Sequence, residues 1–172
     1  MRRAPCPDFE TDRLVVRDWT ASISSADTRR VLTQALAGIL TEPVLRFLPE
    51  PVQLSSDSET ALSDWIDQRQ TNGTVYTVSK KNGVLIGLLT LAEPERLDLR
   101  LGYLLGEAHW GKGFATELIQ GFLNALPNQP GRIIHGGVDP DNAGSARVLL
   151  KSGFTQDTSQ SSTGVQMFTL RG

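Results

Sequence analysis

The sequence predicts an α+β fold in which a mixed, mostly antiparallel sheet of about six to seven strands carries helices on both faces. Apolar and polar residues alternate over 97–105, the period-two pattern of a β-strand. Apolar residues recur at helical spacing over 114–126. An Asn-Gly pair at 82–83 marks a tight turn between two short apolar runs. The chain of 172 residues has the length of one domain, so we expect residues 1–172 to form a single domain with residues 1–10 as an N-terminal tail.

Composition narrows the class of protein. Hydrophobic residues make up 39% of the chain and the formal net charge is −2, values typical of a soluble globular protein. No charge cluster favours nucleic acid or an anionic membrane as a partner. No apolar run approaches the roughly 18 residues of a membrane span, and the N-terminus lacks the apolar core of a secretory signal. The single cysteine, Cys6, cannot form an internal disulfide, which favours a reducing compartment, and we expect a cytoplasmic protein.

The first third of the chain is expected to hold one strand and two helices. Residues 13–19 are rich in β-branched side chains and predict a strand. Residues 26–48 predict a helical region, and residues 56–70 predict a second helix with Ser56 or Asp57 as its cap. The apolar faces of these two helices are expected to contain Val31, Ala35, Leu36, Ile39, Leu40, Ala61, Leu62, Trp65 and Ile66.

The middle of the chain is expected to form an antiparallel meander. Residues 74–80 and 84–91 predict two strands that are joined by the turn at 82–83. Residues 93–95 (Glu-Pro-Glu) are expected to turn the chain into the strand at 97–105. Three consecutive strands therefore become neighbours in the sheet.

The last part of the chain is expected to add a strand, a helix and a terminal hairpin. Residues 132–138 predict a short buried strand, and Asp141 or Asn142 can cap the helix that follows it. Phe154 and residues 165–171 are expected to lie in the final strands. The inward face of that helix is expected to hold Ala146, Leu149 and Leu150.

A glycine-rich stretch, GEAHWGKG at 106–113, separates the strand at 97–105 from the helix at 114–126 and contains three glycines in eight residues. Backbone N–H groups in such a turn and in the first turn of a helix lack internal acceptors, and the helix dipole favours negative charge there. Glycine lets the backbone approach a phosphate closely and adopt positive φ. We therefore expect residues 111–116 to bind a phosphate or pyrophosphate.

Two nucleotide-binding patterns fit this stretch only in part. Gly106 followed by Gly111 and Lys112 nearly matches the P-loop pattern G-x-x-x-x-G-K-S/T, but Gly113 replaces the hydroxyl residue that would ligate Mg²⁺. Gly111 and Gly113 also supply two glycines of the dinucleotide pattern G-x-G-x-x-G, whose third position is here Thr116. A nucleotide-binding protein therefore remains a weaker alternative.

Three segments resemble the GNAT acyltransferases. Residues 102–119 (GYLLGEAHWGKGFATELI) are similar to the acetyl-CoA loop of that family, with the pattern Q/R-x-x-G-x-G/A. The last two fixed positions match, and Trp110 departs from the first. Residues 11–19 (TDRLVVRDW) resemble the opening strand of the branch that contains ribosomal-protein N-terminal acetyltransferases, and 141–154 (DNAGSARVLLKSGF) resemble its late helix. The resemblance implies a GNAT-like three-layer fold.

The same resemblance implies that acetyl-CoA is the acyl donor and that no metal takes part. In such folds the central strand and the strand after the loop helix diverge at one end, and the pantetheine arm lies in the gap. It would bond to the main chain of Leu104 and Leu105, with Asn142 beside its amide and Ser145 near the sulfur. Lys112 is equally well explained as a solvated loop residue. The residues expected to hold acetyl-CoA are Leu104, Leu105, Trp110, Gly111, Lys112, Gly113, Phe114, Ala115, Thr116, Asn142 and Ser145.

Direct acyl transfer needs a neutral amine, a polarised carbonyl and a proton for the departing thiolate. Ser145 is expected to hydrogen-bond or protonate that thiolate, although a helix serine can also bond an upstream carbonyl. Asp98 on the central strand and Glu107 beyond it are the candidate bases, and each is also explained as a solvated polar residue. His135 lies on an apolar strand and is more typical of a structural core histidine. The other polar residues that flank the central strand are Glu93 and His109.

The acceptor is expected to be a primary amine, on a protein N-terminus or on a small molecule. A peptide α-amine with a pKa near ~8 is about one-tenth neutral at pH 7, whereas a lysine side chain near ~10.4 is almost fully charged. A site without an evident strong base therefore suits an α-amine better than lysine. A monomer and a homodimer both remain open, and a CoA-binding module that acts as a sensor or interaction protein is the alternative to an enzyme.

Overall fold

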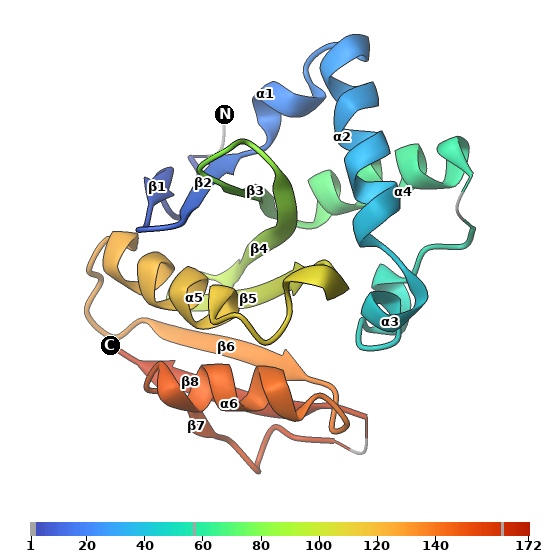
Figure 1. The fold of residues 1–172 in the computed structure, drawn as a ribbon. Coiled ribbons are helices and arrows are strands. Elements are labelled where there is room, and N and C mark those ends of the chain that lie inside the picture. Colours follow the sequence, from blue (N-terminus) through green and yellow to red (C-terminus); the bar gives the residue numbers. More distant parts are fainter. Residues whose placement is uncertain (1–2, 57, 163) are drawn as a thin grey trace.

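The computed structural model describes residues 3–56, 58–162 and 164–172, which form one eight-stranded sheet with helices on both faces (Figure 1). The strand order is β1-β2-β3-β4-β5-β6-β8-β7. Neighbouring strands are antiparallel except β5 and β6, which are parallel. The predicted α+β class with a mixed, mostly antiparallel sheet is confirmed, and the count of strands exceeds the expected six to seven.

Sixteen elements follow one another along the described chain. The strands are β1 (Phe9–Glu10), β2 (Leu14–Asp18), β3 (Thr74–Lys80), β4 (Leu85–Glu95), β5 (Asp98–Leu105), β6 (Ile133–Val138), β7 (Thr155–Gln156) and β8 (Gln166–Arg171). The helices are α1 (Thr20–Ile23), α2 (Ala26–Ile39), α3 (Glu42–Leu45), η1 (Glu50–Val52), α4 (Glu59–Asn72), η2 (Glu107–His109), α5 (Phe114–Ala125) and α6 (Ala143–Lys151). None of the helices in the described residues is long and apolar enough to cross a lipid bilayer.

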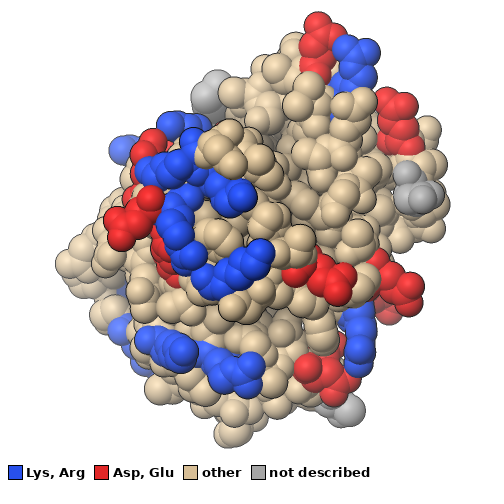
Figure 2. Space-filling model, in the orientation of Figure 1, with Lys and Arg blue, Asp and Glu red and all other residues tan. Residues whose placement is uncertain are grey.

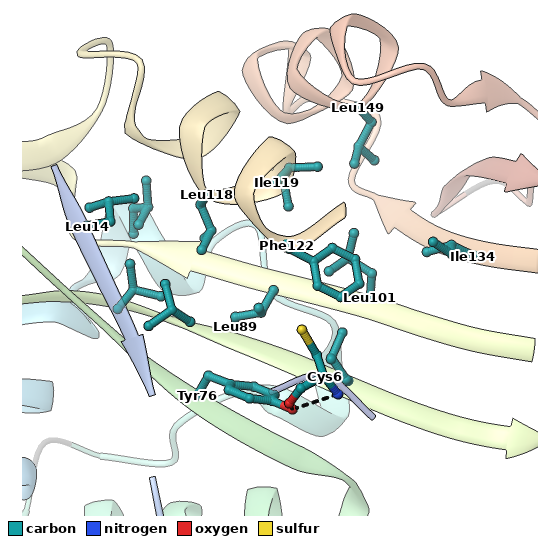
Figure 3. Close-up of a cluster of buried hydrophobic side chains, with 14 of the residues drawn as sticks. Cys6, Leu14, Tyr76, Leu89, Leu101, Leu118, Ile119, Phe122, Ile134 and Leu149 are labelled. Carbon is teal, nitrogen blue, oxygen red and sulfur yellow. Dashed lines mark hydrogen bonds between the residues drawn. The ribbon is translucent and has the colours of Figure 1, made fainter. Parts of the chain in front are cut away.

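Two hydrophobic clusters lie on opposite faces of the sheet because strand side chains alternate between faces. The first packs under α5 and α6 and includes the fully buried Leu118, Ile119 and Phe122 of α5 (Figure 3). The second packs under α2 and α4. Strand β5 contributes to both clusters, since Leu101 belongs to the first and Leu104 to the second. The central strand is thus fixed from both sides.

The N-terminal segment was expected to be a tail, but part of it is folded against the sheet. Cys6 is only 1% exposed, and the hydroxyl of Tyr76 donates to its carbonyl oxygen at 2.7 Å. The N–H of Cys6 donates back to the same hydroxyl at 3.3 Å (Figure 3). Burial raises the pKa of the Cys6 thiol to about 11. Strand β1 then pairs with β2, which accounts for the additional strand.

Several predicted boundaries and faces need correction. The helix expected over 26–48 ends as α2 at Ile39, and Val31 is 67% exposed because Leu32 turns inward in its place. Ser58, and not Ser56, caps α4 by accepting a hydrogen bond from the N–H of Ala61 at 3.2 Å. The alternative cap, Asp57, lies outside the described residues.

The predicted turn at 93–95 is also wrong, because β4 continues through Glu95 with an irregular register after Ala92 and the chain turns at 96–97. In α6, Leu149 is buried as expected, whereas Leu150 is 52% exposed. The side chain of Leu150 points away from β6, because it follows Leu149 by one residue on the helix.

Candidate functional site

The sheet opens between its two parallel strands. Residues Asp98 to Leu101 of β5 pair with Ile133 to Gly136 of β6. Beyond Leu101 and Gly136 no further pairing joins the two strands among the described residues, although β5 continues to Leu105. The predicted divergence is therefore present, and four residues of β5 border a gap.

The hydrogen-bond phase of β5 decides which main-chain groups face this gap. The N–H of Gly106 donates to the carbonyl of Ile86 on β4 at 2.8 Å. Antiparallel pairs alternate between bonded and non-bonded types, so the main-chain groups of Leu104 point to β4, and those of Tyr103 and Leu105 point to the gap. The prediction that Leu104 offers its main chain to a ligand is therefore wrong, and Tyr103 takes that position.

The gap ends at a loop whose amides are free. Within the described residues, the six consecutive N–H groups of 111–116 donate to no protein acceptor. Gly111 and Gly113 have φ values of +70° and +80°, and Gly113 is the residue before α5. Positive φ at Gly111 and Gly113 before a helix is typical of a nest, a backbone geometry in which successive N–H groups can face one anion. The predicted phosphate loop thus has the required donors.

Trp110 closes the end of the gap. Its indole Nε1–H donates to the carbonyl of Leu105 at 2.8 Å, and its ring lies 6.2 Å from that of Phe47. The indole thereby occupies a carbonyl that faces the gap and leaves the N–H of Leu105 free. Trp110 supplies neither the side-chain amide of a glutamine nor the positive charge of an arginine, the two residues that the family pattern has at this position.

Arg13 brings positive charge to the loop from a distant part of the chain. Its Nη1 donates to the carbonyl of Lys112 at 3.0 Å, and its guanidinium lies 4.2 Å from the ring centre of Phe114. Its Nε donates to Glu117 Oε2 at 2.6 Å, and Thr11 donates to Glu117 Oε1 at 2.5 Å. Figure 2 shows Lys and Arg side chains gathered on the face that carries α5 and α6. The loop is therefore braced through Glu117 and lies in a basic region.

The hydrogen bonds that Glu117 accepts from Thr11 and Arg13, here called the brace, make the free energy of unfolding depend on pH. Burial alone raises the pKa of Glu117, but hydrogen bonds from Thr11 and Arg13 outweigh it and hold the pKa below 4.5. The resulting stabilisation is present above the unfolded pKa and is lost as the pH falls through the folded one. We expect Glu117→Gln to lower the melting temperature by about 3–6 °C at pH 7, with a difference that shrinks below pH 4.

Thermal melts of both proteins between pH 3 and pH 7 measure this difference. The matched control is Glu59→Gln, in the first turn of α4, where the side chain is exposed. A difference between wild type and Glu117→Gln that stays constant across this range would contradict the assignment of the brace to the ionised carboxylate.

Two hydroxyl groups meet beside the gap. The Tyr103 hydroxyl on β5 lies 2.6 Å from the Ser145 hydroxyl on α6. Asn142 caps α6 by accepting from the N–H of Ser145 at 3.1 Å, which fixes the start of the helix. Burial raises the pKa of Tyr103, although the hydrogen bond with Ser145 opposes the shift, so the phenol stays protonated at neutral pH. Sequence reasoning missed Tyr103, although its place in the alternation of β5 put it on the side of α6.

A cleft with a volume of about 960 Å³ connects these groups and continues through the gap to the other face of the sheet. Of the predicted site residues, those that line it are Leu104, Leu105, Trp110, Gly111, Gly113, Phe114, Ala115, Thr116, Asn142 and Ser145, and His109 and His135 do so as well. In the described part of the cleft, Lys112, Asp98 and Glu107 are not lining residues. The two candidate bases therefore do not reach the cleft directly.

Asp98 instead contacts a histidine that does reach the cleft. Its Oδ1 lies 3.4 Å from Nε2 of His135, whose side chain is 11% exposed. The other ring nitrogen, Nδ1, is buried without a hydrogen-bond partner among the described residues. His135 is therefore more than a fully satisfied core histidine. In the tautomer that carries its proton on Nε2, facing Asp98, Nδ1 is an acceptor without a partner among the described residues.

His109 is the second histidine in the cleft and lies at its loop end. Partial burial, together with the charges of Lys80 and Lys112, lowers its pKa below 6.5. Its ring packs edge-on to Phe114 with centroids 6.2 Å apart. A neutral His109 beside the loop adds no charge there at pH 7.

Comparison with known proteins places these features in a family context. Residues 13–155 match the family model described as "Acetyltransferase (GNAT) domain". The chain is similar to L-methionine sulfoximine/L-methionine sulfone acetyltransferase of Salmonella typhimurium, with 25% identity over 115 residues that cover 64% of this chain and 67% of the relative. It is 31% identical over 87 residues to the uncharacterized N-acetyltransferase p20 of Bacillus licheniformis, covering 46% of this chain and 47% of that protein, so the match spans about half of the relative.

A solved structure shows the same fold. RimL, a ribosomal L7/L12 α-N-protein acetyltransferase in complex with coenzyme A, superposes with a TM-score of 0.68. The superposition covers 95% of this chain and 97% of RimL at 17% sequence identity. At this identity the likeness concerns the fold.

Proposed function

Because the chain belongs to the GNAT family of acetyltransferases, we propose that it moves an acetyl group from acetyl-CoA to a primary amine by direct transfer, with residues 1–172 acting as a single domain. One observation carries the proposal: six free amides at 111–116 adjoin an open strand edge at Tyr103 and Leu105. A diphosphate and a peptide-like arm need those two features side by side. Acetyl-CoA would supply the activated acetyl thioester.

The residues that would hold acetyl-CoA fit its two recognition elements. The amides of 111–116 would bind the pyrophosphate, with the Thr116 hydroxyl as a further donor. The N–H and carbonyl of Tyr103 and the N–H of Leu105 would pair with the amides of the pantetheine arm as an added strand would. The capped N-terminus of α6, with Asn142 and Ser145, would form the other wall. Lys112 would contribute charge from outside the cleft.

Tyr103 and Ser145 would act on the sulfur. Both hydroxyl groups are neutral at pH 7, and each can donate while the other accepts. The Ser145 hydroxyl would donate to the departing thiolate, and the Tyr103 hydroxyl would replace that proton through the 2.6 Å contact. The second proton of the attacking amine, released as the amide forms, would return to Tyr103 through water. The free N–H of Leu105 would polarise the thioester carbonyl. These roles need no charged acid in the cleft.

We propose that His135, and not its partner Asp98, is the general base. His135 Nδ1 would accept a proton from the acceptor ammonium through bridging water, and Asp98 would hold the ring orientation and stabilise the charged ring. Glu107, which stands apart from the cleft, has no role in this scheme. His135→Gln should lower kcat/KM about 100-fold at pH 7.

The His135 variant has a direct control and readout. Coenzyme A affinity, measured by calorimetry, should change less than about twofold because His135 lies away from the loop. The loss in kcat/KM should shrink as the pH rises and more amine becomes neutral. A loss that is the same from pH 7 to pH 9 would contradict the base assignment.

The function itself is tested by thiol release from acetyl-CoA in the presence of an amine panel. Matched peptides with free and with blocked N-termini, the latter carrying one lysine, separate α-amines from side-chain amines. We expect the free α-amine to react faster by at least about tenfold, since far more of it is neutral. Equal rates would contradict the preference for α-amines. Coenzyme A binding without turnover of any amine would favour the CoA-binding module.

A further inference from the structure

Positive charge lines the part of the cleft beyond the gap, where Arg69 of α4 and Arg100 of β5 lie. Arg147 of α6 also lines the cleft, and none of the three arginines forms an ion pair within the described residues. Among the described residues, the acidic lining is Asp139 and Asp141. Both are engaged: Asp139 accepts the N–H of Asp141 at 2.8 Å, and Asp141 lies 4.0 Å from Arg46.

Arg100 is a cation close to the gap, because it belongs to the last stretch of β5 that pairs with β6. Within the described residues its guanidinium makes no hydrogen bond or ion pair, and its side chain is exposed to the cleft. It lies two residues before Gly102 on the same face of β5, a spacing of about 7 Å along a strand. Gly102 is the first residue after the last β5–β6 pair, so Arg100 stands just below the point where the strands part.

Arg69 is held in place but incompletely satisfied. Its Nη2 donates to the carbonyl of Pro51 at 3.0 Å, and its guanidinium lies 5.6 Å from the ring centre of Trp65. Its Nε is buried and has no hydrogen-bond partner among the residues that the structure describes. Only three buried side-chain polar atoms lack a partner in the described part of the chain, and two of them, Arg69 Nε and His135 Nδ1, belong to cleft-lining residues.

From this arrangement we infer that the acceptor is an amine that carries a carboxylate, such as an α-amino acid, and that Arg100 binds the carboxylate with Arg69 as a second cation. This inference rests on the proposed acetyl transfer and specifies its acceptor. A carboxylate would satisfy a guanidinium fork with two parallel hydrogen bonds, and its bound amine would face the opening of the gap. A polyamine would instead bring positive charge toward two arginines.

Sets of three related acceptors that differ only at the carboxylate test the carboxylate site. Each of several α-amino acids is compared with its own carboxamide and with its decarboxylated amine, and spermidine is the polycationic probe. Thiol release gives kcat/KM for each compound. We expect the best carboxylate-bearing acceptor to exceed its carboxamide and its decarboxylated amine by about 10- to 100-fold. The carboxamide has the lower amine pKa, so intrinsic reactivity works against this result.

Arg100→Gln then assigns the preference to a residue. Arg100→Gln should remove most of the preference for the carboxylate-bearing acceptor by raising KM for the amino acid. KM for acetyl-CoA and the rates with acceptors that lack a carboxylate should stay within about twofold of wild type. Arg100→Lys should restore part of it, because the charge remains without the fork. Arg171→Gln is the matched control: Arg171 is exposed on β8, outside the cleft, and carries the same charge.

The possible results distinguish the carboxylate site from the proposed acetyl transfer. Equal or faster reaction of carboxamides, decarboxylated amines or spermidine would overturn the carboxylate site while leaving acetyl transfer intact. The same holds if coenzyme A binds in calorimetry but no carboxylate-bearing amine reacts or binds to the complex. Failure of coenzyme A to bind would instead overturn the proposed function.

Discussion

Replacing Gly113 with valine is expected to raise the dissociation constant of coenzyme A by about 100-fold, through the loss of charge-assisted hydrogen bonds from the loop amides. Gly113 has a φ of +80°, a conformation that a β-branched residue adopts only under strain. A Cβ at this position would also approach Arg13 Nη2 at 3.4 Å, with the rest of the valine side chain still to place. The loop would have to change conformation, and the amides of 111–116 would no longer point to one side.

Gly83→Val is the matched control for this substitution. Gly83 has a φ of +88° in the β3–β4 turn, and a Cβ there would meet nothing within 4 Å. Both variants should lose similar stability in thermal melts because both impose the same backbone strain. Calorimetry should show lost affinity for Gly113→Val alone. A Gly113→Val variant that binds coenzyme A like wild type would contradict the loop assignment.

Removal of either hydroxyl of the Tyr103–Ser145 pair is expected to lower kcat by about 100-fold while KM for acetyl-CoA changes little. Proton donation to a leaving group is worth about 10²–10⁴ in rate. Because Ser145 is proposed to donate and Tyr103 to replenish its proton, Tyr103→Phe and Ser145→Ala interrupt the same relay. The double variant should therefore be only slightly slower than the slower single variant.

The chain offers a control for the tyrosine substitution. Tyr76 is the other tyrosine. It belongs to the first cluster, and its buried hydroxyl donates a hydrogen bond to the carbonyl oxygen of Cys6. Tyr76→Phe should lower the melting temperature and leave kcat unchanged. Additive losses in the Tyr103–Ser145 double variant, or a Tyr103→Phe variant with normal kcat, would refute the relay.

The sequence was sufficient where structure depends on neighbours in the chain. The helix predicted over 114–126 appears as α5, and the glycine loop before it has the positive φ values that glycine allows. Of the two predicted caps, Asp141 and Asn142, it is Asn142 that caps α6. These features follow from side-chain periodicity and local hydrogen bonds, which a single sequence records.

The sequence was insufficient where function depends on pairing between distant segments. Alternation along β5 gives the face of each side chain, but only the bond from Gly106 to Ile86 tells that Tyr103, and not Leu104, turns its main chain to the gap. The pairing of Asp98 with His135 likewise needs the parallel register of β5 and β6. Neither relation leaves a local pattern.

The Arg13–Glu117 brace joins residues 104 apart, so no local pattern predicts it either. The segment 11–19 was assigned only as a strand, whereas its first arginine also reaches the loop that precedes α5. The family pattern has glutamine or arginine where this chain has Trp110, so a comparison of that position alone indicates that the loop lacks a positive charge. The structure instead brings the guanidinium of Arg13 to the loop from the bend that precedes β2.

Binding of coenzyme A to the loop amides is tested by recording backbone amide resonances of the isotope-labelled protein while coenzyme A is added. At 18.8 kDa the chain suits solution NMR. We expect the resonances of the amides of 111–116, Tyr103 and Leu105 to shift together with one dissociation constant. The amide of Leu104 points to β4, so its rate of hydrogen exchange with solvent should stay the same. Shifts confined to other parts of the chain, with the amides of 111–116 unchanged at saturation, would contradict binding of coenzyme A to the loop.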